Sequence, residues 1–456
     1  MTIFKNLMTL WRSLLKWIKR NFEPYFETNK PKPVNLMKKA EISLACLLLS
    51  CMPVSAQADS KTLMFISDSH LDTQWNWDVV TTIDEYVKNT LEQNLALLDK
   101  YPNFRFNFEG AIRYKWMKEY YPAQYARLQS YIDSDRWHVS GCAVDANDVM
   151  VSSAEAIMRN WLYGSVYYKN EFGVRGGRDI MLPDCFGFPY TLPSLAAHCG
   201  MTGFHTAKLS WGSAIYSSLP PFGIWQGVDG SQIYAVYKPQ AYDSHEAYNK
   251  DMANDAEMER IISDNYSKYG LATEIRYVGP RSDHGGGLKD NAGNGENTPY
   301  WLNYSVAAEG PVKVKLSTPD EIFEHLALYK NDKYKVHNDE LPMRVHGVGA
   351  YTSQAVLKNW NRRNELLADA AEKASVAAEW LGAGAYPVET AQRMDEQPLA
   401  GAPRRPHRHV DSQGIYLFAE RILAGQQDFR RRVHQCSRRF CRFSRHPCRR
   451  YSYSII

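Results

Sequence analysis

The chain has 456 residues, a net charge of +4, 44% hydrophobic residues and 13% aromatic residues. This length and composition exclude a wholly disordered chain and are sufficient for one large domain and the start of a second. The charge is uneven, because residues 391–456 contain 14 arginines, 5 acidic residues and no lysine. The rest of the chain is therefore slightly acidic, which gives no reason to expect nucleic acid as a partner.

The N-terminal part of the chain contains a targeting pattern. Residues 37–58 combine two lysines, a short apolar run and small residues that end in Ala56-Gln57-Ala58. This is the pattern of a secretory signal peptide, and its apolar run is too short for a permanent membrane span. We therefore expect export to the periplasm or the cell surface, with residues 1–36 as an upstream extension. Lipoprotein-type cleavage before Cys51 and an amphipathic membrane-surface helix over Leu10–Arg20 are alternatives.

From residue 61 onward, short apolar runs alternate with longer amphipathic runs. Strands are expected at Thr62–Ile66, Phe104–Phe108, Trp137–Ser140 and Asp179–Leu182. Helices are expected at Ile83–Asp99, Tyr114–Ile132, Ala154–Tyr168 and Leu192–His198. This alternation indicates an α/β fold, with a parallel sheet of about seven strands and helices on its faces.

Two later segments set the domain boundaries. Residues 285–300, which are rich in glycine and asparagine, are expected to form a long loop, and Ser353–Leu381 has a long helical pattern. The expected organisation is an α/β catalytic domain over residues 61–340, the first part of a helical bundle over 341–390, and an aberrant, disordered basic tail over 391–456.

The first candidate site follows the first predicted strand, in the segment Ser69-His70-Leu71-Asp72. With one residue between them, His70 and Asp72 lie on the same side of an extended segment, so both can reach one metal ion. Alone, this motif is weak, and a buried histidine beside a surface aspartate is the simpler interpretation.

The second candidate site is Asp184, in the segment Leu182–Pro189, where a strand ends and a helix is about to begin. A side chain at the carboxyl end of a parallel strand lies where such sheets bind ligands. A turn-forming aspartate is the competing interpretation, because Leu192 is too distant for Asp184 to cap the helix that follows.

Together these segments resemble the class II α-mannosidases, which form glycoside hydrolase family 38. The likeness covers approximately residues 62–390. It extends through Leu209-Ser210-Trp211, Gly349-Ala350-Tyr351-Thr352-Ser353-Gln354, Asn361-Arg362-Arg363 and Glu365. The resemblance implies a retaining, exo-acting enzyme that uses Zn²⁺ to hydrolyse terminal α-mannosides of glycans.

The resemblance also implies roles for individual residues. His70 and Asp72 match two zinc ligands, and Asp184 matches the nucleophile, which is also a ligand. For the substrate, the matching positions are Trp75 and Phe186, which line the sugar subsite, and Lys208, a basic position nearby.

Asp283 is the candidate acid/base, because the family places an aspartate before a glycine pair in a loop of this kind. Here the segment between Gly279 and Asp283 is one residue longer and contains Pro280-Arg281. A solvated loop aspartate is the alternative interpretation.

The basic tail after Thr390 departs from the family. One choice of synonymous codons for Ala391–Val410, read one nucleotide later, encodes a string that contains HDDLTGT, similar to the segment in which the family carries a further zinc-binding histidine. We therefore interpret the tail as the product of a frameshift that leaves this chain impaired. A basic arm and a metal knuckle are alternatives, the latter built from Cys436, Cys441, Cys448, His434 and His446.

Two other functions remain open. A non-catalytic carbohydrate-binding remnant would bind mannose without turnover, and a metal-dependent polysaccharide deacetylase would release acetate. The deacetylase leaves the likeness around Phe186 and Tyr351 unexplained. Nucleic-acid binding through the tail ranks last.

Overall fold

The computed structural model describes residues 60–386, apart from residues 147, 174–176, 241–247, 281, 292, 294, 348, 350, 354 and 383–384. The chain divides into two units, Met1–Ala58 and Asp59–Ile456. The predicted upstream extension, signal peptide and basic tail all lie outside the described residues. Within the described residues, no helix combines the length and the hydropathy needed to cross a bilayer.

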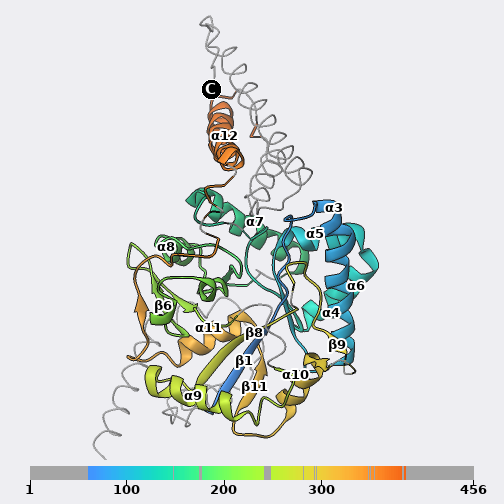
Figure 1. Cartoon of the computed structure of the whole chain (residues 1–456). Helices are drawn as coiled ribbons and strands as arrows, with labels where there is room; N and C mark the ends of the chain where they lie inside the picture. Colours follow the sequence, from blue (N-terminus) through green and yellow to red (C-terminus); the bar gives the residue numbers. More distant parts are fainter. Residues whose placement is uncertain are drawn as a thin grey trace, which may run out of the picture. The chain divides into compact units, whose positions relative to one another are not determined.

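The first sheet has three parallel strands, in the order β11-β1-β8 (Figure 1). Strand β1 (Thr62–Ser67) lies between β8 (Thr273–Val278) and β11 (Lys313–Leu316), and pairs in parallel with both. Strands β2 (Phe106–Phe108) and β3 (Trp137–Val139) form a second parallel pair. A parallel bridge between Asp68 and Asn107 connects the end of β1 to β2.

A second sheet has the order β12-β6-β7-β5-β4. Strands β4 (Asp179–Met181), β5 (Gly203–His205) and β7 (Gln232–Val236) are parallel to one another. Strand β6 (Phe222–Gln226) runs antiparallel to β7 and pairs in parallel with β12 (Val336–His337). The predicted α/β architecture with parallel strands is thus confirmed. In the described residues these strands are divided among three sheets rather than one sheet of about seven, and β6 is antiparallel to β7.

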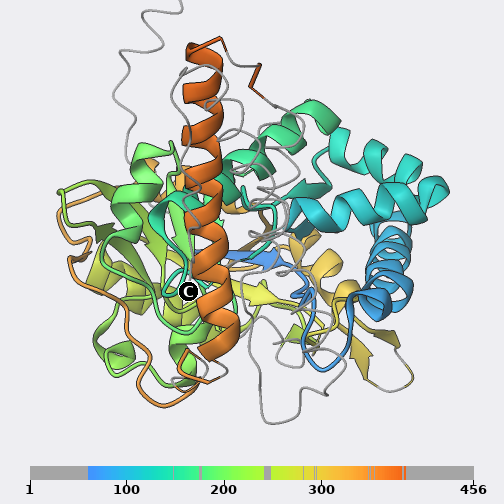
Figure 2. The same cartoon turned by 90° about the horizontal axis from the view of Figure 1, so that it is seen from above.

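Helices connect these strands. They are α3 (Val79–Thr81), the π-helix η2 (Thr82–Val87), α4 (Lys88–Lys100), α5 (Ala111–Tyr120), α6 (Pro122–Asp133), α7 (Ala154–Phe172), α8 (Leu192–His198), α9 (Ala256–Tyr269), α10 (Thr298–Ala307), α11 (Pro319–Leu328) and α12 (Ala355–Trp380), with 3-10 turns η3 (Lys208–Trp211) and η4 (Tyr216–Ser218). Helices α4, α5 and α6 lie together on one side of the strands (Figure 2).

Two sequence-based expectations are corrected. The single helix expected over Tyr114–Ile132 is two helices, because Pro122 begins α6 and cannot continue α5. The long loop expected over residues 285–300 contains a short hairpin of β9 (Asp290–Asn291) and β10 (Glu296–Asn297), followed by the start of α10. The loop's composition did not reveal the hairpin, because both of its strands are only two residues long.

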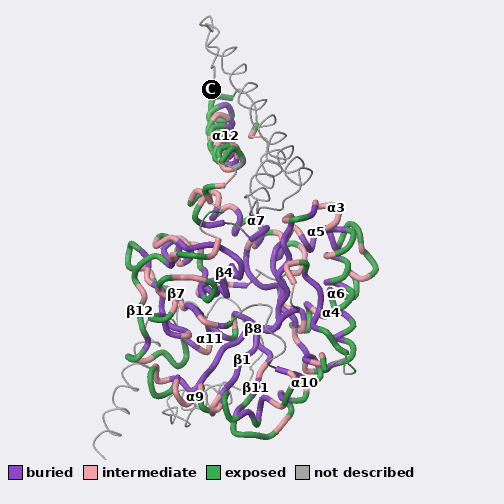
Figure 3. Tube along the Cα trace, viewed as in Figure 1, coloured by how far each residue is buried: buried purple, intermediate pink, exposed green. Residues whose placement is uncertain are grey.

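Most of the strands in the described part of the chain are buried (Figure 3). One apolar cluster packs β1, β2 and β3 against α4, α5 and α6, and a second packs β4, β5 and β7 against α7 and α8. Trp137, Trp161 and Trp225 are among the largest fully buried side chains. Burial of apolar side chains from this many elements fixes the strand ends, which carry the polar residues described next.

Candidate active site

Polar side chains converge at the carboxyl ends of β1 and β4. His70 Nε2 lies 3.3 Å from an Asp72 carboxylate oxygen and 3.7 Å from an Asp184 carboxylate oxygen. The exposed fractions of His70, Asp72 and Asp184 are 1%, 4% and 3%. Residues separated by more than one hundred positions in the sequence thus form one buried polar cluster, as the predicted strand ends required.

Asp283 joins this cluster from the segment after β8. One ligand atom each from His70, Asp72, Asp184 and Asp283 lies within 4.8 Å of every other. The backbone holds Asp283 there, because the Asp72 N–H donates to the Asp283 carbonyl at 3.0 Å and the Gly285 N–H donates to the His70 carbonyl at 2.9 Å. Asp283 is more exposed than the other three residues, so it lies on the solvent side of the cluster.

The glycine loop after Asp283 fits tightly against α4. Gly285 and Gly286 have φ angles of +70° and +97°, which L side chains rarely adopt. The Gly286 N–H donates to Thr90 Oγ1 at 2.7 Å, and Asn94 Nδ2 donates to the Gly286 carbonyl at 3.0 Å. A Cβ atom on Gly285 would lie 2.2 Å from Thr90 Oγ1, so the close approach requires glycine there.

The donor atoms of this cluster suit a divalent metal. An imidazole nitrogen and carboxylate oxygens are ligands that zinc accepts, and the burial of His70, Asp72 and Asp184 excludes competing water. Buried carboxylates at such short separations also need a positive charge beside them. The residues present therefore fit a metal ion.

Lys208 supplies one positive charge to the cluster from the start of η3. Its side chain is fully buried and forms an ion pair with Asp184. The Lys208 ammonium lies 3.8 Å from the centre of the Trp211 ring and 5.1 Å from that of Phe186, both within the range of cation–π attraction. Lys208 thus compensates the charge of Asp184 directly, which is a closer role than the sequence indicated.

The aromatic residues expected near the sugar differ in exposure. Phe186 is only 4% exposed, and a Cβ atom on Gly347 would lie 1.9 Å from its ring, so residues around 347 cover it. Trp75 is half-buried against Trp77, with ring centres 5.8 Å apart. Trp211 is 37% exposed and contacts Lys208, which makes it a candidate for substrate contact that sequence reasoning did not single out.

Buried polar residues support the cluster from behind. Arg113, with no exposed surface, donates to the Leu71 carbonyl at 2.5 Å and pairs with Asp145 at 3.0 Å. Thr73 Oγ1 donates to the same Asp145 carboxylate at 2.6 Å. These contacts hold the segment that carries His70. Sequence reasoning missed Arg113, because nothing in the pattern of α5 distinguishes it from a surface arginine.

Tyr351 holds the segment that follows the predicted nucleophile. Its hydroxyl accepts the Phe186 N–H at 3.0 Å and donates to Asp148 at 3.3 Å. Burial, and then the negative charge of Asp148, raise the pKa of Tyr351 well above its ordinary value. The hydroxyl therefore stays protonated and can make both hydrogen bonds. The Tyr351-Thr352-Ser353 likeness was the sequence signal for this contact.

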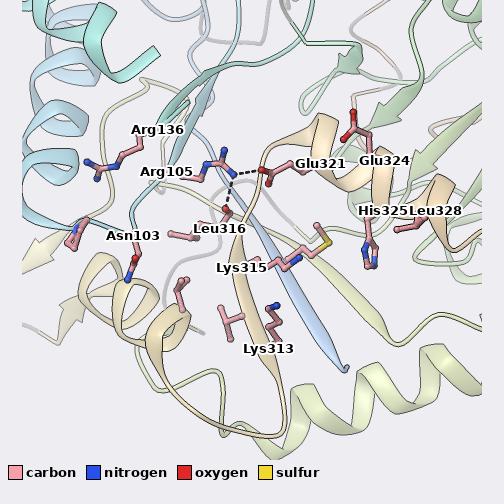
Figure 4. Close-up of a pocket in the computed structure, with 14 residues that line it drawn as sticks. Asn103, Arg105, Arg136, Lys313, Lys315, Leu316, Glu321, Glu324, His325 and Leu328 are labelled. Carbon is pink, nitrogen blue, oxygen red and sulfur yellow. Dashed lines mark hydrogen bonds and ion pairs between the residues drawn. The ribbon is translucent and has the colours of Figure 1, made fainter. Parts of the chain in front are cut away.

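A cavity of about 730 Å³ lies elsewhere, beside β11 and α11 (Figure 4). Arg105 there hydrogen-bonds to Glu321 at 2.7 Å and to the Leu316 carbonyl at 3.5 Å. Burial, and secondarily the charge of Lys315, lower the pKa of His325 in its wall to about 4. The strand residues that line this cavity come before the strand ends at which the His70 cluster lies. This cavity is therefore separate from the candidate active site.

A parallel α/β domain with an imidazole and three carboxylates gathered at its strand ends is an arrangement suited to metal-assisted hydrolysis. Residues 60–340 match the glycosyl hydrolases family 38 N-terminal domain. The chain therefore belongs to glycoside hydrolase family 38, as the motifs indicated.

The named relatives agree with this assignment, and a solved structure shares the fold. The chain is 29% identical over 320 residues to alpha-mannosidase G of Dictyostelium discoideum, covering 69% of this chain and 27% of that protein. It is 27% identical over 367 residues to alpha-mannosidase 2C1 of Homo sapiens, covering 79% of this chain and 33% of that protein. The crystal structure of an alpha-mannosidase from Enterococcus faecalis V583 has the same fold, with a TM-score of 0.64 at 16% identity, over 84% of this chain and 43% of that one. The chain thus spans between about a quarter and a third of the length of these curated relatives.

Proposed function

We propose that this domain is the catalytic part of a retaining, exo-acting α-mannosidase that hydrolyses terminal α-mannosides of glycans. The observation that carries the proposal is the short distance between the carboxylates of Asp184 and Asp283. Their nearest carboxylate oxygens lie no more than 4.8 Å apart. Retaining glycosidases hold their two carboxyl groups roughly 5 to 5.5 Å apart, whereas inverting enzymes need about 6.5 to 9.5 Å.

His70, Asp72 and Asp184 are the residues that would hold the metal, which we propose to be zinc. When bound, zinc would act as a Lewis acid toward sugar hydroxyl oxygens and would stabilise the negative charge that develops beside them. Among the named relatives, the alpha-mannosidases of Dictyostelium discoideum and Homo sapiens carry the activity in their names, which supports the proposed substrate class.

The chain's own residues divide the reaction between them. Asp184 attacks the anomeric carbon as the bond to the leaving oxygen breaks, and Asp283 gives its proton to that oxygen. In the second half, Asp283 takes a proton from water, whose oxygen attacks the anomeric carbon and releases Asp184. Lys208 balances the charge of the free Asp184 carboxylate before and after the covalent step.

Trapping of the covalent intermediate tests this proposal. A 2-deoxy-2-fluoro-α-mannosyl fluoride should add one sugar to the protein, and peptide mass spectrometry should place it on Asp184. Asp184→Asn should prevent labelling, whereas Asp339→Asn, at an exposed position, should leave it intact. A sugar on any other residue, or inversion at the anomeric carbon, would overturn the assignment.

Two finer proposals concern the segments outside the described residues. We propose that residues 37–58 direct export to the periplasm or cell surface, which the N-terminal sequence of the mature protein would check.

We also propose that residues 391–456 arise from a frameshift, because a shifted reading of Ala391–Val410 can encode the family's histidine-containing segment. Sequencing the gene around codon 390 tests this directly.

The carbohydrate-binding remnant is the second candidate, because an ammonium that stays paired with the Asp184 carboxylate would lower its nucleophilicity and leave binding without turnover. A remnant would bind mannose without becoming labelled. The family assignment favours both of these candidates over a polysaccharide deacetylase.

A further inference from the structure

Three buried polar side chains connect the strands beneath the active site. Asp179 in β4 and His205 in β5 form a hydrogen bond, with 2.7 Å between Asp179 Oδ2 and His205 Nε2. The Tyr277 hydroxyl in β8 contacts His205 Nδ1. None of the three has any exposed surface. The catalytic steps proposed above use none of them.

The polarity of this network can be assigned. Burial, followed by the charges of Asp68, Asp179 and Glu109, raises the pKa of Tyr277 well above its ordinary value, so Tyr277 stays a neutral phenol. The hydroxyl of Tyr277 can therefore donate a hydrogen bond to His205 Nδ1, while His205 Nε2–H donates to Asp179. The other Asp179 oxygen accepts the Gly141 N–H at 2.9 Å, which extends the network to the residues after β3.

The fit around Asp179 is tight. A Cβ atom on Gly177 would lie 2.1 Å from Asp179 Oδ1, so only glycine allows the carboxylate to stay in this position. The network thus connects β4, β5 and β8 with the end of β3 in one hydrogen-bonded layer.

The same strands carry the candidate catalytic groups only a few residues later. Asp184 follows β4, Lys208 follows β5 and Asp283 follows β8. A shift of one strand relative to another would therefore displace one of these groups from the other two. Catalytic geometry is lost by displacements of about 1 Å. The positions of the three strands along their axes must therefore be fixed relative to one another.

We propose that His205 is a positioning residue. Together with Asp179 and Tyr277, it fixes the positions of β4, β5 and β8 along their axes. It thereby holds Asp184, Lys208 and Asp283 at the correct distances from one another. This inference rests on the proposed function for its catalytic consequence. Its structural part, the locking of three strand ends, stands independently of activity and is tested separately.

Hydrogen exchange of a variant that lacks the Tyr277 hydroxyl tests whether the network fixes the three strand ends. Tyr277→Phe removes only the hydrogen bond to His205. It should speed exchange about tenfold at the backbone amides of residues 182, 184–186 and 282–286, because a buried hydrogen bond is lost. The matched control is Tyr237→Phe, since Tyr237 is also buried and donates to the Ile224 carbonyl at 3.1 Å. The control should speed exchange only within residues 222–237.

Zinc affinity and kinetics test the catalytic consequence in the full chain. Tyr277→Phe and His205→Gln should weaken zinc binding about tenfold in chelator competition and lower kcat on an aryl α-mannoside with KM nearly unchanged. Asp179→Asn should act in the same direction. A lower melting temperature with unchanged zinc affinity, kcat and local exchange would show a merely structural role and overturn the proposal.

The two proposals fail differently. If the wild-type chain neither binds zinc nor hydrolyses the mannoside, the proposed function fails, and the exchange experiment still decides the locking. If wild type is active while Tyr277→Phe matches Tyr237→Phe in exchange, zinc affinity and kcat, the positioning role fails and the proposed function stands.

Discussion

Asp283 can serve either as proton donor or as a further metal ligand, since its carboxylate lies within 4.8 Å of the ligand atoms of His70, Asp72 and Asp184. It is the most exposed member of the cluster. The solvent side is where a leaving group must depart. This position therefore favours the acid/base role.

Asp283→Asn separates the two roles. As the acid/base, its loss should lower kcat about 10² to 10⁴-fold on substrates with poor leaving groups. A dinitrophenyl α-mannoside, which needs no protonation, should lose much less, and the zinc content should not change. Loss of zinc from the purified variant, measured by elemental analysis, would instead assign Asp283 as a ligand.

Tyr351 offers a test of the segment that follows Asp184. Tyr351→Phe leaves the Phe186 N–H without its acceptor at 3.0 Å, and it also removes the hydrogen bond to Asp148. We expect the free energy of unfolding to fall by about 1 to 3 kcal/mol, the usual cost of leaving such a group unsatisfied. Urea denaturation measures this. Tyr300→Phe, at a 44% exposed position, should change nothing, and an equal effect from both variants would contradict the account.

At the scale of the elements, the glycine loop against α4 positions Asp283. Gly285→Ala meets both a φ of +70° and a Cβ contact of 2.2 Å to Thr90 Oγ1. Gly295→Ala meets a similar φ of +73° with open space around it, so it isolates the backbone cost of about 1 to 2 kcal/mol. Gly285→Ala should cost more than this in urea denaturation and should also lower kcat. Equal stability and activity in the two variants would show that the loop tolerates displacement.

Helix α11 packs against β5 and β7 and places His325 beside Thr273 of β8, which makes stability depend on pH through His325. Its pKa is lowered to about 4 from an ordinary 6.5, by burial first and Lys315 second, and its Nε2 lies 2.8 Å from Thr273 Oγ1. A neutral folded histidine stabilises the fold fully above about pH 6.5, and this contribution is lost as the pH falls toward 4. With solvent screening of this partly exposed group, the loss should be no more than about 3 kcal/mol.

Lys315→Gln should raise the pKa of His325, because it removes the second cause of the shift, while burial still keeps the pKa below 6.5. Titration of the His325 ring signals by NMR measures this. Lys330→Gln, at an exposed position just after α11, is the control. A His325 pKa that stays at about 4 in Lys315→Gln would leave burial as the whole cause.

Much of the element order follows from local pattern. The run at Thr62–Ile66 became β1, and the helix at Leu192–His198 has the predicted bounds, because apolar periodicity and flanking turns specify such elements. The strand ends likewise predicted the meeting of His70 with Asp184. Pairings that depend on the tertiary fold gave no local signal. Arg113 behind His70 and the link from His205 to Tyr277 both join residues that only the folded chain brings together.

For the molecule as a whole, α12 carries apolar side chains that the described part of the chain leaves exposed. Leu366, Val376 and Trp380 are 54%, 56% and 85% exposed. At 3.6 residues per turn they lie on one side of the helix. Arg159 of α7 anchors α12 through Glu372, with contacts of 2.6 and 2.5 Å. A clustered apolar face on an anchored helix is typical of a surface that packs against further structure.

This surface yields a prediction that separates the present chain from one with the reading frame restored after Thr390. Leu366→Glu with Trp380→Glu should reduce self-association of the present chain, measured by light scattering, because it removes exposed apolar area. In the restored chain the same pair should lower the melting temperature, because we expect the proposed helical bundle to bury this face and a buried unpaired charge is costly. Val228→Glu, at a 56% exposed position, is the control for added charge. If the paired substitutions have the same effect on both chains, the restored sequence does not cover α12, and the frameshift interpretation loses its structural consequence.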